Sequence, residues 1–198
     1  MNKFLLEIQN LLREWGLSGN FYPIASETRN WVWWKSAKCP TTCRYCSKRH
    51  GKIFAREDIQ FLSPPEIPEA HPNCNCTLPP LEKIKPGTAT VDGADGVDLY
   101  LYTFGMLPTG KYVTKAMAKK AGWKEGKSVN KYLPEITIGG DVYKNREGKL
   151  PQTPGRTWKE ADINYNGGRR KTHRIVWSND GLIFVTYDHF ETFFEIRS

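Results

Sequence analysis

A set of ionisable side chains in the second half of the chain could carry out acid–base chemistry on a phosphodiester. Glu160, Arg174 and His189 lie on, or directly after, successive strand-like segments, and neighbouring antiparallel strands can bring such residues to one face. A carboxylate can remove the proton of a ribose 2′-hydroxyl while an imidazolium protonates the departing 5′-oxygen. Lys115, Arg170 and Arg174 would neutralise the charge on the phosphate oxygens. Such a set favours metal-independent cleavage of RNA, a route closed to DNA because DNA lacks the 2′-hydroxyl.

Each of these residues also has an ordinary structural interpretation. A glutamate on a strand commonly faces solvent, and a single histidine is commonly a surface or core residue with a satisfied ring. Arg170 and Arg174 could simply be ion-pair partners of Asp162. Spacing alone therefore leaves the chemical and the structural interpretation open.

The sequence predicts that these residues are positioned by helices followed by strands. Asp92 or Asp95 can begin a helix that ends at Gly105, and Thr114 can begin a second helix that ends at Gly122. Short alternating apolar runs then predict strands at Arg156 to Asp162, Arg174 to Ser178 and Leu182 to Tyr187. Asn179-Asp180-Gly181 has hairpin-turn chemistry. The order predicts an α+β fold whose antiparallel sheet is covered on one face.

The first half has a different organisation. Apolar residues between Phe4 and Trp15 repeat at helical spacing, and Trp31 to Trp34 and Lys52 to Phe54 are candidate strands. Prolines are dense between Ser63 and Gly87, which opposes regular structure there. We therefore predict two units, residues 1–86 and residues 87–198.

Composition limits the class of protein. The 198 residues are 39% hydrophobic and 13% aromatic, which excludes wholesale disorder. With 29 Lys and Arg against 21 Asp and Glu, the formal charge is +8, which permits a phosphate-bearing partner such as RNA. No apolar run approaches the roughly 18 residues of a membrane span, so no membrane partner is expected. The first residues lack the pattern of a secretory signal, so export would need a non-classical route.

All five cysteines lie in the first half. Cys43 and Cys46 form one close pair, and His71, Cys74 and Cys76 follow after a gap. Two such knuckles suit a tetrahedral structural Zn²⁺ site, which would stabilise a small Cys-rich domain. Disulfides are the alternative if the protein leaves the cell. With two disulfides, the fifth cysteine, Cys39 or a member of the 74–76 pair, would be left over.

Longer motifs indicate a family. The runs Ile138 to Pro151, Gly155 to Tyr165 and Thr186-Tyr-Asp-His189 closely resemble the barnase-type guanyl-preferring ribonucleases of bacteria. The resemblance covers about residues 92–198 and implies the microbial ribonuclease fold, with N-terminal helices before the sheet.

The resemblance also implies roles for individual residues. Glu160 would be the general base and His189 the general acid, with Lys115, Arg170 and Arg174 on the scissile phosphate. Guanine would be held by the loop Tyr143-Lys144-Asn145-Arg146-Glu147, where the Glu147 carboxylate can accept from adjacent purine donors. Asp141 and Asn145 would organise loops, and Arg156 with Asp180, and Asp162 with the arginines, would be supporting ion pairs. Phe190 stands where the family has a tyrosine, Arg169 replaces an aromatic residue and Gly181 a tryptophan, which puts subsite binding and rate in question.

A second resemblance concerns the cysteine-rich segment. Cys43-x-x-Cys46, His50-Gly51 and His71-Pro-Asn-Cys-Asn-Cys76 resemble the C-terminal signature of phage Mu F-like minor head proteins, over about residues 39–80. The combination implies a phage-head-derived adaptor joined to a toxin ribonuclease, delivered by a phage-like or secretion apparatus into a target cytoplasm. Such a toxin implies a cognate acidic inhibitor, and the ribonuclease resemblance points to a barstar-like immunity protein. The alternative is a catalytically silent structural or nucleic-acid-binding module of phage origin.

Overall fold

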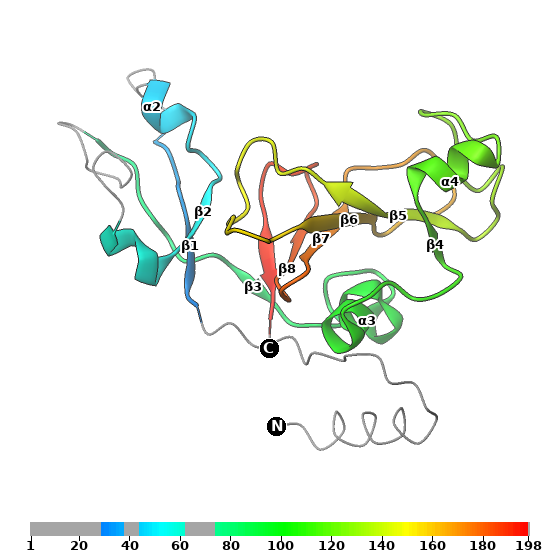
Figure 1. Ribbon diagram of the computed structural model, residues 1–198, viewed down its shortest axis with the longest axis horizontal. Helices are drawn as coiled ribbons and strands as arrows, with labels where there is room; N and C mark the ends of the chain where they lie inside the picture. Colours follow the sequence, from blue (N-terminus) through cyan, green and yellow to red (C-terminus); the bar gives the residue numbers. More distant parts are fainter. Residues whose placement is uncertain (1–28, 38–43, 62–73, 198) are drawn as a thin grey trace, which may run out of the picture.

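The computed structural model describes residues 29–37, 44–61 and 74–197. Its main feature is a seven-stranded sheet with helices beside it and a separate two-stranded hairpin at one end (Figure 1). The predicted α+β class is confirmed. The predicted helix from Phe4 to Trp15 lies outside the described residues. Within the described ranges, no helix is both long enough and apolar enough to span a bilayer.

The large sheet has the strand order β3-β9-β8-β7-β6-β5-β4. Its strands are β3 (Lys83–Ile84), β4 (Tyr112–Val113), β5 (Thr137–Tyr143), β6 (Trp158–Asp162), β7 (Arg174–Ser178), β8 (Ile183–Thr186) and β9 (Phe194–Ile196). The five central strands are antiparallel, as expected. Both edges differ from the expectation, because β3 runs parallel to β9 and β4 runs parallel to β5. Each edge strand is two residues long and reaches the sheet from a preceding loop rather than through a hairpin.

The first predicted helix is present as α3 (Val97–Phe104), and Gly105 ends it in a left-handed conformation. The predicted cap was wrong, because neither Asp92 nor Asp95 caps α3. Residues Gly93–Asp95 instead form the short 3-10 helix η2, and Gly96 occupies the N-cap position. Space explains the glycine, since a Cβ at Gly96 would lie 2.0 Å from the hydroxyl of Thr90.

The second helix and the hairpin follow their predicted signals. Helix α4 (Lys115–Lys120) begins at Thr114, whose hydroxyl accepts a hydrogen bond from the Met117 N–H at 3.3 Å. It ends just before Gly122, which has a φ of 92°. Strands β7 and β8 pair around the turn that contains Gly181, whose φ of 96° suits glycine.

The sheet has an apolar core on each face because side chains alternate along its strands. On one face α3 packs against the sheet, and the buried residues are Ala89, Val97, Leu101, Ala161, Ile163, Ile175, Trp177, Ile183, Val185 and Ile196. The other face is also covered: Leu150, Trp158, Val176, Leu182, Phe184 and Phe193 pack with Trp31, Ile53, Ala55 and Leu81. The sheet is therefore not covered on one face alone.

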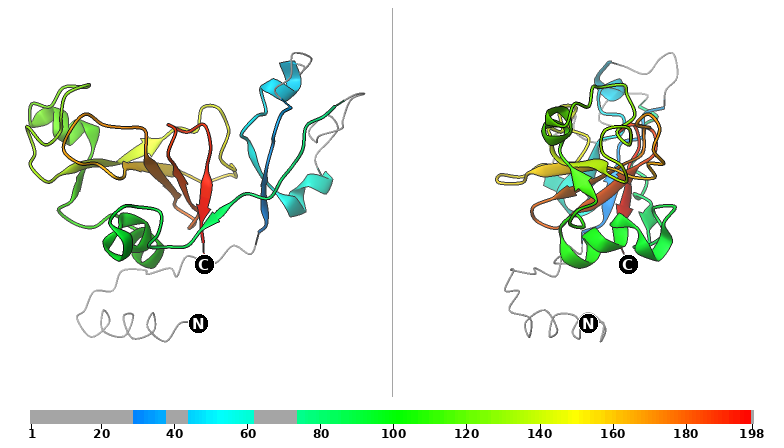
Figure 2. Two further views of the ribbon diagram at one scale, coloured as in Figure 1. Left: turned by 180° about the vertical axis from the view of Figure 1, so that it is seen from behind. Right: turned by 90° about the vertical axis from the view of Figure 1, so that its right-hand side faces the viewer.

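The residues that cover the second face come mainly from the hairpin of β1 (Trp31–Trp33) and β2 (Ile53–Ala55). Between these strands lies the short helix α2 (Arg44–Ser47), and the 3-10 helix η1 (Arg56–Phe61) follows β2. Figure 2 shows the hairpin standing next to β3, at the end of the sheet opposite α4. The division into residues 1–86 and 87–198 stays a prediction, and the hairpin and the sheet share one core across it.

Candidate active site

Glu160 lies in the middle of β6, between Asp141 on β5 and Val176 on β7. Its side chain is largely buried, and one carboxylate oxygen contacts Lys115 Nζ at 2.5 Å. Lys115 begins α4, and its N–H donates to the Asp141 carboxylate at 2.9 Å. The predicted organising role of Asp141 therefore has a physical basis, because this bond fixes the start of α4 beside β5. As a result, the ammonium group of Lys115 lies against the carboxylate of Glu160.

Arg170 and Arg174 converge on the buried carboxylate of Asp162. Arg170 donates from Nε and Nη2 to the two carboxylate oxygens, at 2.5 and 2.7 Å. Arg174 Nε lies 2.9 Å from Asp162 Oδ1. Burial lowers the pKa of Arg174, and the charge of Asp162 offsets part of this effect. Burial also acts to lower the pKa of Arg170, but the hydrogen bonds from Arg170 to Asp162 outweigh it, so the pKa of Arg170 is raised. The predicted supporting ion pairs are thus present, and they place two guanidinium groups behind Glu160.

His189 lies in the turn after β8, as predicted, and is exposed. Its backbone and that of Phe190 are left-handed, with φ of 63° and 73°, a conformation that costs free energy in residues other than glycine. Asp188 stabilises the turn by accepting from the N–H groups of Glu191 and Thr192 at 3.1 and 2.9 Å. Thr186 links the two ends of the turn: its hydroxyl accepts from the Phe190 N–H at 3.0 Å and donates to Asp188 at 2.9 Å. We call residues 186–192 the acid turn.

The predicted guanine-binding residues form a loop after β5. Asn145, with a φ of 44°, organises it: its side chain donates to Leu150 O at 2.8 Å and accepts from the Leu150 N–H at 3.1 Å. Glu147 is exposed and lies 3.1 Å from Lys149 Nζ. Lys149 is buried, and it also contacts the acid turn because its Nζ donates to Phe190 O at 2.9 Å. We call residues 143–150 the base loop.

The base loop and the acid turn enclose one cleft of about 390 Å³. Its lining consists of Val142, Tyr143, Lys144, Asn145, Arg146, Glu147, Glu160, His189, Phe190 and Glu191. The rings of Tyr143 and Phe190 stack across it with centroids 4.9 Å apart. Lys115, Arg170 and Arg174 do not line this cleft and lie beside and behind Glu160. Burial, with the nearby Glu147 and Glu160, raises the pKa of Tyr143 to about 12, so its hydroxyl stays protonated near neutral pH.

Comparisons with known proteins place the chain in a family. The ribonuclease family matches residues 107–197. A ribonuclease of Heyndrickxia coagulans is 47% identical over 110 residues, which are 55% of this chain and the whole of that protein. The chain belongs to the ribonuclease family. Ribonucleases of Bacillus intermedius and Bacillus pumilus are each 47% identical over 110 residues, covering 67% of their length.

Two contributors to this ribonuclease cleft escaped sequence reasoning. Asp188 shapes the acid turn by accepting from the Thr192 N–H. The sequence signal for this role is an Asp in a turn, because its short side chain commonly accepts hydrogen bonds from backbone N–H groups of the residues that follow. Lys149 bridges the base loop and the acid turn, and its single positive charge after Glu147 and Gly148 carried no comparable signal. Burial acts to lower the pKa of Lys149, but its bonds to Glu191 and Glu147 raise it overall.

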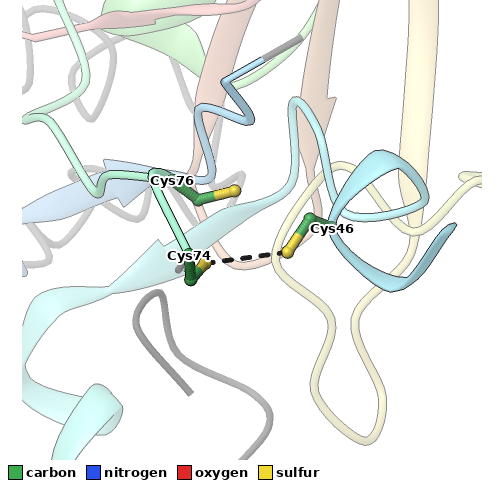
Figure 3. Close-up of side chains that lie close together, drawn as sticks. All are labelled: Cys46, Cys74 and Cys76. Carbon is green, nitrogen blue, oxygen red and sulfur yellow. Dashed lines mark hydrogen bonds between the residues drawn. The ribbon is translucent and has the colours of Figure 1, made fainter. Parts of the chain in front are cut away.

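Three of the predicted metal ligands are among the described residues, and they lie close together. Cys46, on α2, faces Cys74 and Cys76, and the three Sγ atoms lie within 4.8 Å of one another (Figure 3). No disulfide joins any two of these three cysteines. Cys43 and His71 lie outside the described residues. The Sγ atoms of Cys46 and Cys74 are 3.8 Å apart, which is about the edge of a tetrahedron built from Zn–S bonds of about 2.3 Å. This donor set fits a zinc ion.

Proposed function

We propose that this protein is an endoribonuclease that cleaves single-stranded RNA after guanosine. One observation carries the proposal: Glu160 and His189 line the same cleft as the base loop. The 47% identity to bacterial ribonucleases supports the reaction class.

The reaction would be an internal transphosphorylation. Glu160 removes the proton of the 2′-hydroxyl, and the 2′-oxygen forms a bond to the adjacent phosphorus. The bond from phosphorus to the 5′-oxygen breaks, and His189 gives its proton to that oxygen. The products are a 2′,3′-cyclic phosphate and a free 5′-hydroxyl. Lys115, beside Glu160, and Arg170 and Arg174, near it, supply positive charge where the phosphate oxygens become more negative.

Guanine preference would come from the base loop. Glu147 is exposed at the cleft and presents a carboxylate that can accept from the N1 and N2 donors of guanine. Adenine has no such pair of donors on that edge. The stacked rings of Tyr143 and Phe190 offer an aromatic surface for a base. Phe190 lacks the hydroxyl of a tyrosine, so this position contributes packing and no side-chain hydrogen bond.

The test is incubation of the purified chain with RNA and with DNA of the same sequence, both in EDTA. We expect RNA to be cut, with 2′,3′-cyclic phosphate ends on guanosine, and DNA to stay intact. Dinucleoside substrates GpA and ApA then measure the preference through the ratio of their kcat/KM values. A protein that is inert in EDTA and regains activity with Mg²⁺ contradicts the mechanism. Full inactivity favours the silent phage-derived module.

For the cysteine cluster we propose a structural zinc ion held by Cys46, Cys74 and Cys76, with Cys43 or His71 completing four ligands. Thiolates that meet in a largely buried site match the donor set of closed zinc sites. A metal there would tie α2 to the segment before β3. No step of the catalysis needs it.

The biological role we propose is a toxin that is delivered by a phage-like or secretion apparatus and acts in a target cytoplasm. The likeness of residues 39–80 to phage Mu F-like head proteins, still a prediction, supports the delivery part. A producer of such an enzyme needs a cognate inhibitor. Arg146 lines the cleft, and Lys115, Arg170 and Arg174 lie near Glu160, so we expect this inhibitor to be acidic. The family resemblance points to a barstar-like protein.

A further inference from the structure

One short turn of the N-terminal segment touches both walls of the candidate cleft. Residues 48–52, which we call the brace turn, lead from α2 into β2. The Ile53 N–H, at the start of β2, donates to Lys149 O of the base loop at 2.8 Å. Gly51 faces the acid turn: a Cβ there would lie 3.2 Å from Glu191 O and 3.5 Å from Lys149 Cε.

The brace turn is itself held firmly by the hairpin. Trp34, fully buried just after β1, donates to Lys52 O at 2.8 Å and accepts from the Gly51 N–H at 2.9 Å. The ring of His50 packs edge-on against Trp33, with centroids 5.7 Å apart. Trp34 also packs against Cys46 and Cys76. The turn therefore stands between a packed support and the two walls of the cleft.

The contacts beyond the brace turn reach groups that would bind substrate. Lys149 accepts from the Ile53 N–H just after the turn, and its Cε lies 3.5 Å from where a Cβ of Gly51 would be. Its Nζ lies 3.1 Å from Glu147 and donates to Phe190 O and to Glu191. A displacement of the brace turn would thus move the Glu147 carboxylate relative to His189. Active sites are sensitive to such shifts, since about 1 Å of misplacement can cost roughly 100-fold in rate.

A comparison indicates that this support is an addition to the ribonuclease unit. The Heyndrickxia coagulans ribonuclease matches over its whole length with 110 residues of this chain. A match of that length that includes residues 107–197 cannot extend back to the brace turn. The matched 110 residues therefore include no counterpart of the brace turn.

We propose that Gly51, with the brace turn, is a positioning residue that sets guanine preference by fixing the base loop against the acid turn. The inference rests on the proposed function, because it assigns a role in that reaction. Gly51 does not contact substrate and acts through Lys149 and Glu191.

The test compares two glycine-to-alanine variants of the full chain. Gly51 and Gly126 have φ of 80° and 79°, so alanine costs each a similar backbone strain, but a Cβ at Gly126 meets nothing within 4 Å. In Gly51→Ala we expect the GpA to ApA ratio of kcat/KM to fall by about tenfold, mainly through KM for GpA. In Gly126→Ala we expect the wild-type ratio. Simple destabilisation would reduce kcat/KM equally for GpA and ApA and leave their ratio unchanged.

A second measurement covers the case in which Gly51→Ala also folds less well. Hydrogen exchange followed by mass spectrometry should show faster exchange in the peptides that span the base loop and the acid turn, and unchanged exchange in α3. A wild-type GpA to ApA ratio in Gly51→Ala, or equal exchange in both variants, overturns the inference while the proposed function stands. A wild-type protein that cuts no RNA overturns both.

Discussion

At the scale of single residues, the candidate site depends on buried ion pairs that bring charges together. Asp162 holds two arginines, and Lys115 lies against Glu160. Breaking a buried pair by removing one partner leaves the other charge without compensation, which commonly costs about 3–5 kcal/mol. Substitutions at Asp162 would therefore unfold the protein and report little about chemistry. Glu160 is the better probe because its partner Lys115 is one-third exposed and can be solvated.

We predict that Glu160→Gln retains the fold and loses most of the transphosphorylation, by about 100-fold to 10,000-fold in kcat for a general base. The amide keeps the size of the side chain but cannot take up the proton. Steady-state cleavage of GpA measures the effect, with circular dichroism as the check on folding. Glu125→Gln is the matched control, because Glu125 is an exposed carboxylate that pairs with Lys119 on α4. A Glu160→Gln enzyme with wild-type kcat would remove Glu160 from the mechanism.

Asp188 gives a pH-dependent prediction. Burial acts to raise its pKa, but hydrogen bonds from Thr192 and Thr186 outweigh burial and lower it. The folded pKa is thus below the unfolded value of about 3.9. The stabilisation is complete above that value and is lost as the pH falls through the folded pKa.

Accordingly, Asp188→Asn should unfold more easily than the wild type at pH 7, by about 1–2 kcal/mol for weakened hydrogen bonds. The difference should shrink in acid below about pH 4, where the wild type loses the same stabilisation. Urea unfolding at pH 7 and at pH 3 makes the comparison. A gap that is constant or wider at pH 3 would show that the carboxylate charge does not stabilise the acid turn.

At the scale of elements, the sequence predicted best where a local pattern was enough. Thr114 and the run ending in Gly181 carry capping and turn chemistry that acts over a few residues, and both elements formed as expected. The expected cap at Asp92 or Asp95 failed because residues 93–95 form η2 first, which moves the start of α3 to Gly96. The parallel edges could not be predicted either, because they depend on where distant loops enter the sheet.

The candidate site shows the same division. Glu160, His189 and the base loop, which the family resemblance named, line one cleft. The resemblance gave no sign of Gly51, because the lack of space for a side chain there depends on Lys149 and Glu191, which are far away in the chain. Side-chain type suggests a role only when the role is chemical. A glycine that is needed because a side chain would not fit is recognisable only from the structure around it.

The cysteine cluster provides the prediction at this scale. The purified chain should carry about one zinc ion, by the pattern of closed thiolate sites. Replacing Cys46 or Cys74 by serine should release the metal and lower Tm, while Cys39→Ser, outside the predicted ligand set, should leave zinc content unchanged. Elemental analysis and thermal unfolding give the two readouts. Protein without zinc whose mass shows paired cysteines would favour disulfides.

At the scale of the whole molecule, charge gives the protein its expected partners. The chain carries a formal charge of +8, and Lys144 and Arg146 line the exposed cleft together with Glu147, Glu160 and Glu191. A positive surface around a cleft attracts polyanions and acidic proteins at long range.

An acidic inhibitor should therefore bind across the cleft and compete with RNA. Its association rate should fall steeply between low and physiological salt, as charge steering is screened over about 10 Å at 0.1 M ionic strength. Arg146→Ala should slow association more than Lys48→Ala, because Lys48 lies in the brace turn and does not line the cleft. Stopped-flow measurements with the protein encoded beside this gene test the idea. A complex that still cleaves RNA would show that the inhibitor does not occupy the cleft.

The parallel pairing of β3 with β9 has a consequence for the order of events during synthesis. Strand β9 is the last strand of the sheet, and β3 pairs with it from a position that the ribosome makes much earlier. The residues of β3 must wait, unpaired with the sheet, until β9 has emerged. Closing so long a loop is slow because distant contacts carry a large entropic cost. During synthesis, a nascent chain thus completes this edge of the sheet last.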